Sequence, residues 1–202
     1  MTRLANHPER NVIRLQLKQH KALEGLSDDD REALEPHLFI ADGRKGEFLR
    51  RQGSREMVQY FILDGILKRV VSNADGKEMI LRFAHEDEME TSYAAWRTGT
   101  PTPYGIVCVT KARVAGLPLP EWADFIDARP KVKEDFEFNV MKVMTEIMAH
   151  TITLHLLDAP GRVNRFMRKK PDLADRIPQK ELASYLNIAA ETLSRLRHSG
   201  RA

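Results

Sequence analysis

Cysteine is nearly absent from this sequence, because Cys108 is the single one among 202 residues. One thiol cannot form a disulfide within the chain, and it cannot supply a zinc or iron–sulfur site that needs four cysteines. An oxygen-sensing cluster of that kind is therefore excluded. Cys108 lies in the apolar run Gly105 to Val109, so we expect a buried and unreactive thiol.

Long apolar runs are also missing. No uncharged apolar stretch approaches the roughly 18 residues that a membrane-spanning helix needs. The segment Met1 to Asn11 carries Arg3, Glu9 and Arg10 and has no apolar centre, so it does not resemble a secretory signal. We expect a cytoplasmic protein with no membrane partner.

Patterns typical of metal sites and catalytic sites are lacking as well. His85, Glu86, Asp87 and Glu88 are adjacent, but a cupin-type metal site would need a His-x-His pair and a further distant histidine. A solvated acidic loop explains these residues better. No nucleophile and base occur at a recognisable spacing, so we expect no metal ion and no enzymatic activity.

Positive charge is unevenly distributed. The chain has 32 Lys and Arg against 29 Asp and Glu, and ten of these cations against four of the acids lie between Pro160 and Ala202. A basic carboxy-terminal segment on a near-neutral body is typical of a DNA-binding module, although a solvated basic helix pair would give the same sum.

The central part of the chain has the pattern of an antiparallel β domain. From Phe39 to about Leu119, short β-rich runs alternate with Gly-containing turn signals. Asp64-Gly65 predicts a hairpin between Val58–Leu63 and Ile66–Ser72, and Asn73 to Gly76 predicts the next hairpin. Before this region, Ser27 can cap a short helix. The fold class is therefore predicted as α+β.

A long helix is predicted after Pro130, and it ends at Asp158-Ala159-Pro160-Gly161. Its apolar residues recur at alternating steps of three and four, as in a coiled coil. We expect this seam to form a homodimer interface, the alternative being a core helix of the same chain. The predicted interface residues are Phe136, Val140, Val143, Met144, Ile147, Thr151 and Leu154.

The last part of the chain predicts a helix-turn-helix. Pro178 suits a first helical position, Asn187 can adopt the left-handed conformation of a tight turn, and a second helix begins near Ala190. Burial of the leucines on this second helix would leave a polar face for the major groove. That face comprises Glu191, Thr192, Ser194, Arg195 and His198. A merely solvated face is the alternative.

Other polar and basic residues around this motif are predicted to contact DNA phosphates, which sets affinity rather than sequence preference. They are Arg165, Arg168, Lys169, Lys170, Lys180, Thr192, Arg197 and Arg201.

Four segments together resemble the Crp/Fnr superfamily of transcription regulators: LSDDDREALEPH, KGEFLRRQG, YFILDGILKRVVSNADGKEMILRF and IPQKELASYLNIAAETLSRLR. The resemblance implies a β-roll effector domain over residues 1–129, a dimerisation helix over 130–158 and a winged helix-turn-helix over 159–202. It also implies double-stranded DNA and RNA polymerase as partners. Glu191, Ser194 and Arg195 fall on the base-reading positions of the Fnr-like branch, which implies palindromic half-sites similar to TTGAT.

Three features depart from that family's pattern. Ala189 stands where relatives have a capping Ser or Thr, a loss of about 1 kcal/mol of helix stability. The chain ends at Ala202, so we expect a short or missing wing. The Gly-Glu-Leu turn and the Arg-Ser pair that hold cyclic nucleotides are replaced by Thr91-Ser92-Tyr93 and Pro103-Tyr104.

Without the phosphate-binding arginine, and with acidic residues beside the turn, we expect no cyclic AMP binding. The effector is then another small molecule or none, and the hydroxyls of Thr91, Ser92, Tyr93 and Tyr104 would line its pocket. We also consider a second function, a small-molecule-binding module that acts through a protein partner and has a degenerate DNA-binding end.

Overall fold

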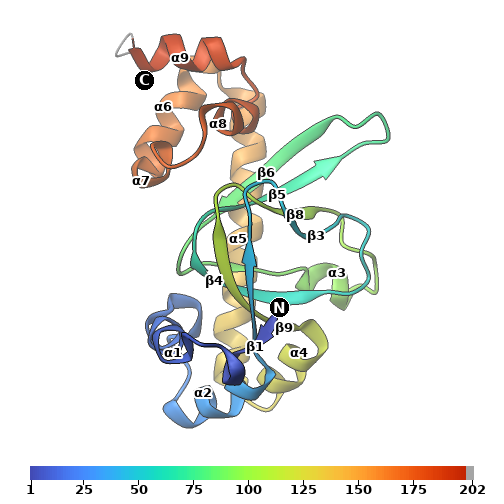
Figure 1. Ribbon diagram of the computed structural model, residues 1–202. Helices are drawn as coiled ribbons and strands as arrows, with labels where there is room; N and C mark the ends of the chain where they lie inside the picture. The colour runs from blue at the N-terminus through green and yellow to red at the C-terminus, as the bar shows by residue number, and fades with distance from the viewer. Residues whose placement is uncertain (199–202) are drawn as a thin grey trace.

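The computed structural model describes residues 1–198, which form a β-roll, one long helix and a small helical domain in succession (Figure 1). The long helix α5 runs along the whole molecule and connects the two domains (Figure 1). The predicted α+β fold class is confirmed. The predicted Arg201 phosphate contact lies outside the described residues.

The β-roll consists of two antiparallel sheets. One has the strand order β1-β2-β9-β4-β7 and the other β3-β8-β5-β6. Their facing side chains form a hydrophobic core that includes Tyr60, Leu67 and Cys108. Cys108 is buried as predicted, and this burial raises the pKa of its thiol to about 11. The strands are β1 (Thr2–Arg3), β2 (Phe39–Gly43), β3 (Phe48–Arg50), β4 (Val58–Asp64), β5 (Leu67–Ser72), β6 (Glu78–Ala84), β7 (Met89–Glu90), β8 (Gly105–Cys108) and β9 (Ala112–Pro118).

Helices flank the roll at both of its chain ends. Ser27 caps α2 as predicted, since its hydroxyl accepts a hydrogen bond from the amide of Asp30 while the Asp30 carboxylate accepts one from the amide of Ser27. The helix α1 was not predicted; it buries Ile13 and Leu17. The helices are α1 (Arg10–Gln19), α2 (Asp28–Leu34), α3 (Tyr93–Arg97), α4 (Leu119–Asp127), α5 (Pro130–Leu156), α6 (Ala159–Lys169), α7 (Pro171–Ala174), α8 (Gln179–Tyr185) and α9 (Ala190–His198), with short 3₁₀ turns at Leu4–Asn6, Lys21–Leu23 and Glu35–His37.

One of the two predicted hairpins is correct. β5 and β6 pair across Asn73, whose side-chain oxygen accepts a hydrogen bond from the amide of Lys77 at 2.8 Å. The hairpin predicted at Asp64-Gly65 is wrong, because β4 pairs with β7 and β9 while β5 pairs with β6 and β8. The chain passes at this corner from one sheet to the other, and Gly65 has the positive φ of 87° that the corner needs.

The two faces of α5 are used differently. Phe136 is 3 % exposed and packs in the core between the roll and α4, and Val140 packs against the same cluster. Val143, Ile147 and Leu154 are half-buried. The predicted dimer interface is therefore wrong at Phe136. This residue is not on a free surface, because that side of the helix mainly packs against its own chain. Met144 and Thr151 at its margin are exposed.

The opposite face of α5 carries a second series of side chains, four of them apolar and one a threonine. Phe138 is 63 % exposed, and the other members are likewise open to solvent in the single chain. Steps of three, four, three and four residues place Phe138, Met141, Thr145, Met148 and Ile152 on one stripe. We call these five residues the free stripe.

The corner at Gly65 yields a test of the fold. A Cβ atom there would meet the backbone carbonyl of Lys111 and lie 2.7 Å from the Cα atom of Ala112, whereas a Cβ atom at Gly76 would meet nothing. Both glycines have positive φ, so Gly76→Ala should cost about 1–2 kcal/mol and Gly65→Ala about 3–5 kcal/mol because overpacking adds to the strain. Urea unfolding measures both values. Equal losses in the two variants would contradict the close approach.

Candidate DNA-binding surface and effector position

The predicted helix-turn-helix is formed by α8, a tight turn and α9. Asn187 in the turn has a φ of 51°, which is the left-handed conformation predicted for it. Ile188 packs against the domain's apolar core, and its amide donates to the carbonyl of Ala183 at 3.0 Å. Pro178 differs slightly from prediction, since it precedes α8 with an extended ψ of 135° and is not its first helical residue.

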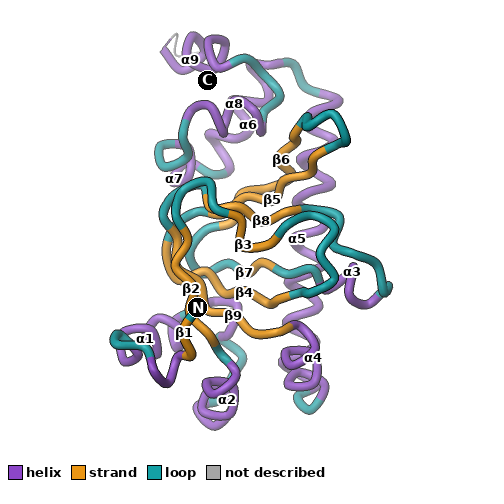
Figure 2. Tube along the Cα trace, turned by 45° about the vertical axis from the view of Figure 1, so that its right-hand side comes forward, coloured by secondary structure: helices purple, strands orange, loops and turns teal. Residues whose placement is uncertain are grey.

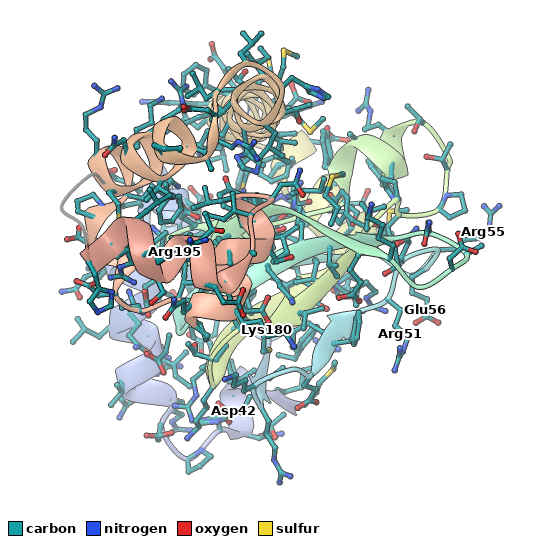
Figure 3. The ribbon with its side chains drawn as sticks, turned by 90° about the horizontal axis from the view of Figure 1, so that it is seen from above. Asp42, Arg51, Arg55, Glu56, Lys180 and Arg195 are labelled. Atoms are coloured by element: carbon teal, nitrogen blue, oxygen red, sulfur yellow. The ribbon has the colours of Figure 1, made fainter. Side chains whose placement is uncertain are left out.

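The helix α9 buries one side and presents the other. Leu193 is completely buried, Glu191 and Arg195 are exposed, and Ser194 is half-buried. Glu191, Arg195 and His198 follow each other at one-turn intervals, so they share a face. This helix lies at the end of the molecule remote from the β-roll, and Figure 3 looks down on that end with Arg195 and Lys180 labelled (Figures 1 and 3).

The predicted phosphate-contacting residues differ in their exposure and in whether a carboxylate already binds them. Lys180 and Arg168 are exposed, and Thr192 is half-buried near the guanidinium of Arg195 at 3.5 Å. Arg197 donates to the carboxylate of Asp175 at 2.7 Å within the same domain. A phosphate would have to compete with Asp175 for Arg197, whereas it would meet Lys180 directly.

Arg165, Lys169 and Lys170 are placed differently from the prediction. They line a cavity where α6 faces α5 and β6, on the side of the domain that docks on the roll. The Nζ atom of Lys170 lies 3.7 Å from a carboxylate oxygen of Glu88 and 3.9 Å from one of Glu146. That these three side chains contact DNA phosphates stays a prediction, and in this arrangement of the domains they line the cavity.

The helical domain docks on the β5–β6 hairpin through aromatic side chains. The Tyr185 ring stacks on the His150 imidazole at 3.7 Å and lies 5.0 Å from the Phe83 ring. Burial lowers the pKa of His150 to about 4, so this imidazole is uncharged near pH 7 and interacts with Tyr185 by ring stacking. Figure 2 shows β5 and β6 between the helical domain above them and the strands β4, β7 and β9 below them.

Two ion pairs cross the same junction. The guanidinium of Arg176 donates to the Glu86 carboxylate at 2.9 Å, and the Nζ atom of Lys68 donates to Glu181 at 2.7 Å. Burial would raise the pKa of Glu86, but the hydrogen bonds from Arg176 and from the amide of Gly65 outweigh it and lower the pKa. Glu86 was predicted to belong to a solvated acidic loop, and it is instead a docking residue.

The predicted effector hydroxyls are bound to protein partners. The Tyr104 hydroxyl donates to the carbonyl of Thr91 at 2.6 Å, and the Ser92 hydroxyl donates to Thr102 at 3.0 Å. The Thr91 hydroxyl accepts from the amide of Tyr93, whose own hydroxyl donates to Glu137 at 2.8 Å. An open pocket lined by these four hydroxyls is therefore not what the structure presents.

A buried charge pair, which the sequence analysis missed, lies beside these groups. Arg69 is 2 % exposed and Glu90 is 1 % exposed, and the Arg69 guanidinium donates to the Glu90 carboxylate. The Arg69 guanidinium also lies 4.5 Å above the Tyr104 ring. The signal was present in the strand, since Arg69 is two residues from the inward-facing Leu67 and so shares its face.

Comparisons with known proteins agree with this architecture. Residues 43–129 match the family model of the cyclic nucleotide-binding domain. The chain is 19% identical over 170 residues to the cAMP-activated global transcriptional regulator CRP of Salmonella typhimurium, covering 79% of this chain and 81% of that protein. Its fold is similar to a Crp/Fnr-family transcriptional regulator from Eubacterium rectale, with TM-score 0.68, 14% identity, and coverage of 87% and 84%. Residues 43–129 therefore belong to the cyclic nucleotide-binding domain family, and the chain as a whole is similar to Crp/Fnr transcription regulators in fold.

A second structure shows the same Crp/Fnr fold. The c-di-GMP responsive global regulator CLP of Xanthomonas campestris has a TM-score of 0.70 at 14% identity, with 86% of this chain and 92% of that chain covered. Within residues 1–198, no helix is long and apolar enough to cross a membrane, and no three metal-ligating side chains converge.

The Arg176–Glu86 pair yields a test of the docking. Glu86→Gln should weaken domain docking by about 1 kcal/mol, a value reduced because both side chains are partly exposed. The pKa of Glu86 is lowered in the docked arrangement. The ion pair therefore stabilises docking fully at pH values above the ordinary carboxylate pKa, and this stabilisation is lost as the pH falls through the lowered pKa. Limited proteolysis between residues 157 and 161 at pH 7 should be faster in the variant than in the wild type. The control is Asp175→Asn, whose ion pair lies within one domain and whose cleavage rate should stay at the wild-type value; equal rates in both variants would contradict the docking role.

Proposed function

We propose that the protein is a homodimeric, sequence-specific DNA-binding transcription regulator that reads palindromic half-sites similar to TTGAT. The observation that carries this proposal is α9, which presents Glu191 and Arg195 at the outer end of the molecule while Leu193 anchors it in the domain core. We infer that it works in the cytoplasm with RNA polymerase as partner and has no enzymatic activity.

The chemistry of these side chains suits one G·C pair and its neighbour. An arginine can donate two hydrogen bonds to guanine O6 and N7, and a glutamate can accept from cytosine N4. Ser194 is half-buried beside them and can bond to either kind of edge. Ala189 precedes α9 and its methyl group cannot cap the helix, so we infer that contact with DNA phosphates orders this end.

We infer that the free stripe of α5 forms the interface of the homodimer. Lone exposed apolar residues are ordinary, but four of them and a threonine at coiled-coil spacing on one helix favour a second copy of the same stripe. Two copies related by a twofold axis would place their α9 helices on one side, as required for half-sites about 34 Å apart. This replaces the predicted interface of Phe136, Val140, Val143, Ile147 and Leu154, and it leaves Met144 and Thr151 at the margin.

We infer that the effector is not cyclic AMP. The position expected to hold a nucleotide phosphate, at Thr91 to Tyr93 and Tyr104, has no free arginine among the described residues, because Arg69 is paired there with Glu90. A phosphate would have to displace the Glu90 carboxylate, which is the internal partner of Arg69.

Base reading is tested by DNA binding of the Arg195→Ala variant. Fluorescence anisotropy across a salt series should give the wild type a preference for a TTGAT palindrome over a scrambled duplex. Arg195→Ala should lose about 1–3 kcal/mol on the palindrome and little on the scrambled duplex. Lys180→Ala is the matched control and should weaken both duplexes alike.

An unchanged preference in Arg195→Ala would refute the assignment of this side chain. Equal and weak binding of both duplexes by the wild type would refute sequence-specific regulation. It would favour the second function, a module that acts through a protein partner.

The dimer is tested by placing a charge on the free stripe. Met148→Glu would bury a carboxylate in the proposed interface, so sedimentation should show a monomer at concentrations at which the wild type is a dimer. Met79→Glu is the control, because Met79 is exposed on the β5–β6 hairpin away from α5. An unaltered dimer in Met148→Glu would place the interface elsewhere.

A further inference from the structure

A cavity of about 280 Å³ lies where α5, β6 and the DNA-binding domain meet. Its wall includes Arg82 from β6, His150 from α5, Arg165 and Lys169 from α6, and Tyr185 from α8. The cavity therefore lies at the junction between the two domains, and its lining includes none of the residues Thr91, Ser92, Tyr93 and Tyr104 that were expected to bind an effector.

The charge on this wall is unbalanced. Five arginines and lysines line the cavity, and Glu146 is the one carboxylate among its lining residues. Arg82 is paired with Glu88, and Lys170 lies near Glu88 and Glu146, so the excess of positive charge comes from the other three cations. Arg162 donates to the backbone carbonyls of Leu186 and Asn187 and not to an acid. Among residues 1–198, Arg165 and Lys169 have no ion-pair partner either. Like charges held together in this way favour an anion, because it would offset their repulsion.

A buried donor on this wall also lacks a partner. Arg82 is 4 % exposed, and its Nη1 atom has no hydrogen-bond acceptor among the described residues. A buried guanidinium N–H left without an acceptor costs free energy. A carboxylate or phosphate oxygen in the cavity would provide that acceptor.

The remaining wall is apolar and aromatic. Phe83, Phe166, Leu173 and Leu186 line it together with the stacked His150 and Tyr185 rings. The volume is at the small end of the range for ligand pockets, about 300–1,000 Å³, which excludes a dinucleotide. A ligand that fits this cavity would have one flat or apolar group and one anionic group.

We propose that this cavity binds a small organic anion, a carboxylate or a phosphate monoester on an aromatic or apolar body. The anionic head contacts Arg82, Arg165 and Lys169, and the body packs between Phe83 and Phe166. Because Arg82 belongs to the roll and the two others to α6, the bound anion joins the domains and holds the docked arrangement. The link to transcription rests on the proposed function, but the binding itself does not.

The test uses benzoate and phenyl phosphate as probes and neutral benzamide for comparison, with the full chain and without DNA. Calorimetry should show saturable binding of one anion per chain, and benzamide should not bind. Arg165→Gln and Lys169→Gln should each weaken anion binding at least about fivefold. Arg168→Gln is the matched control on the same helix and should bind as the wild type does, because Arg168 does not line the cavity.

A second measurement tests the joining of the domains. Phenyl phosphate should slow proteolysis between residues 157 and 161 in the wild type and leave it unchanged in Arg165→Gln. The proposal is overturned if neither anion binds saturably, if benzamide binds equally well, or if neither lining variant weakens binding. It is also overturned if those variants bind anions normally and lose DNA affinity uniformly, since Arg165 and Lys169 would then be phosphate contacts. A protein that failed to discriminate DNA sequences would still bind the probes, so failure of the proposed function is distinguishable.

Discussion

The architecture depends on one helix that has apolar groups on two opposite sides. One side of α5 inserts Phe136 into the core of the roll, and this contact fixes the direction in which the helix leaves the effector domain. The other side leaves Phe138, Met141 and Met148 open in the single chain. The same 27-residue helix continues to the DNA-binding domain, so one element connects the core contact at Phe136, the free stripe and the junction with α6.

The second determinant is the junction at the far end of α5. Tyr185 joins the helix-turn-helix to α5 through His150 and to the roll through Phe83, while the Arg176–Glu86 pair ties the same domain to the end of β6. The basic cavity adjoins this cluster, so a ligand there would act on domain docking directly. A regulator built in this way would be controlled at the junction between its domains, where few contacts have to change for the reading helix to move.

Local patterns were predictable from the sequence, and long-range placements were not. Ser27, Asn187 and the Asn73 turn each act through neighbours a few residues away, so their spacing suffices. The orientation of α5 was not predictable, because apolar residues occur at helical spacing on both of its sides. Arg165 and Lys169 carry the charge expected of phosphate contacts, and only docking of the domain on β6 decides which side of the molecule they face. Asp64-Gly65 has the composition of a hairpin turn, yet its flanking strands belong to different sheets.

The central claim is that two chains read one palindrome through their α9 helices. Native mass spectrometry of the protein with a duplex that carries two inverted TTGAT-type half-sites, centred about one helical turn apart, tests it most directly. The account predicts two chains per duplex at saturation and no stable complex with a scrambled duplex of equal length. Saturation at one chain per duplex, or equal occupancy of the scrambled duplex, would contradict it.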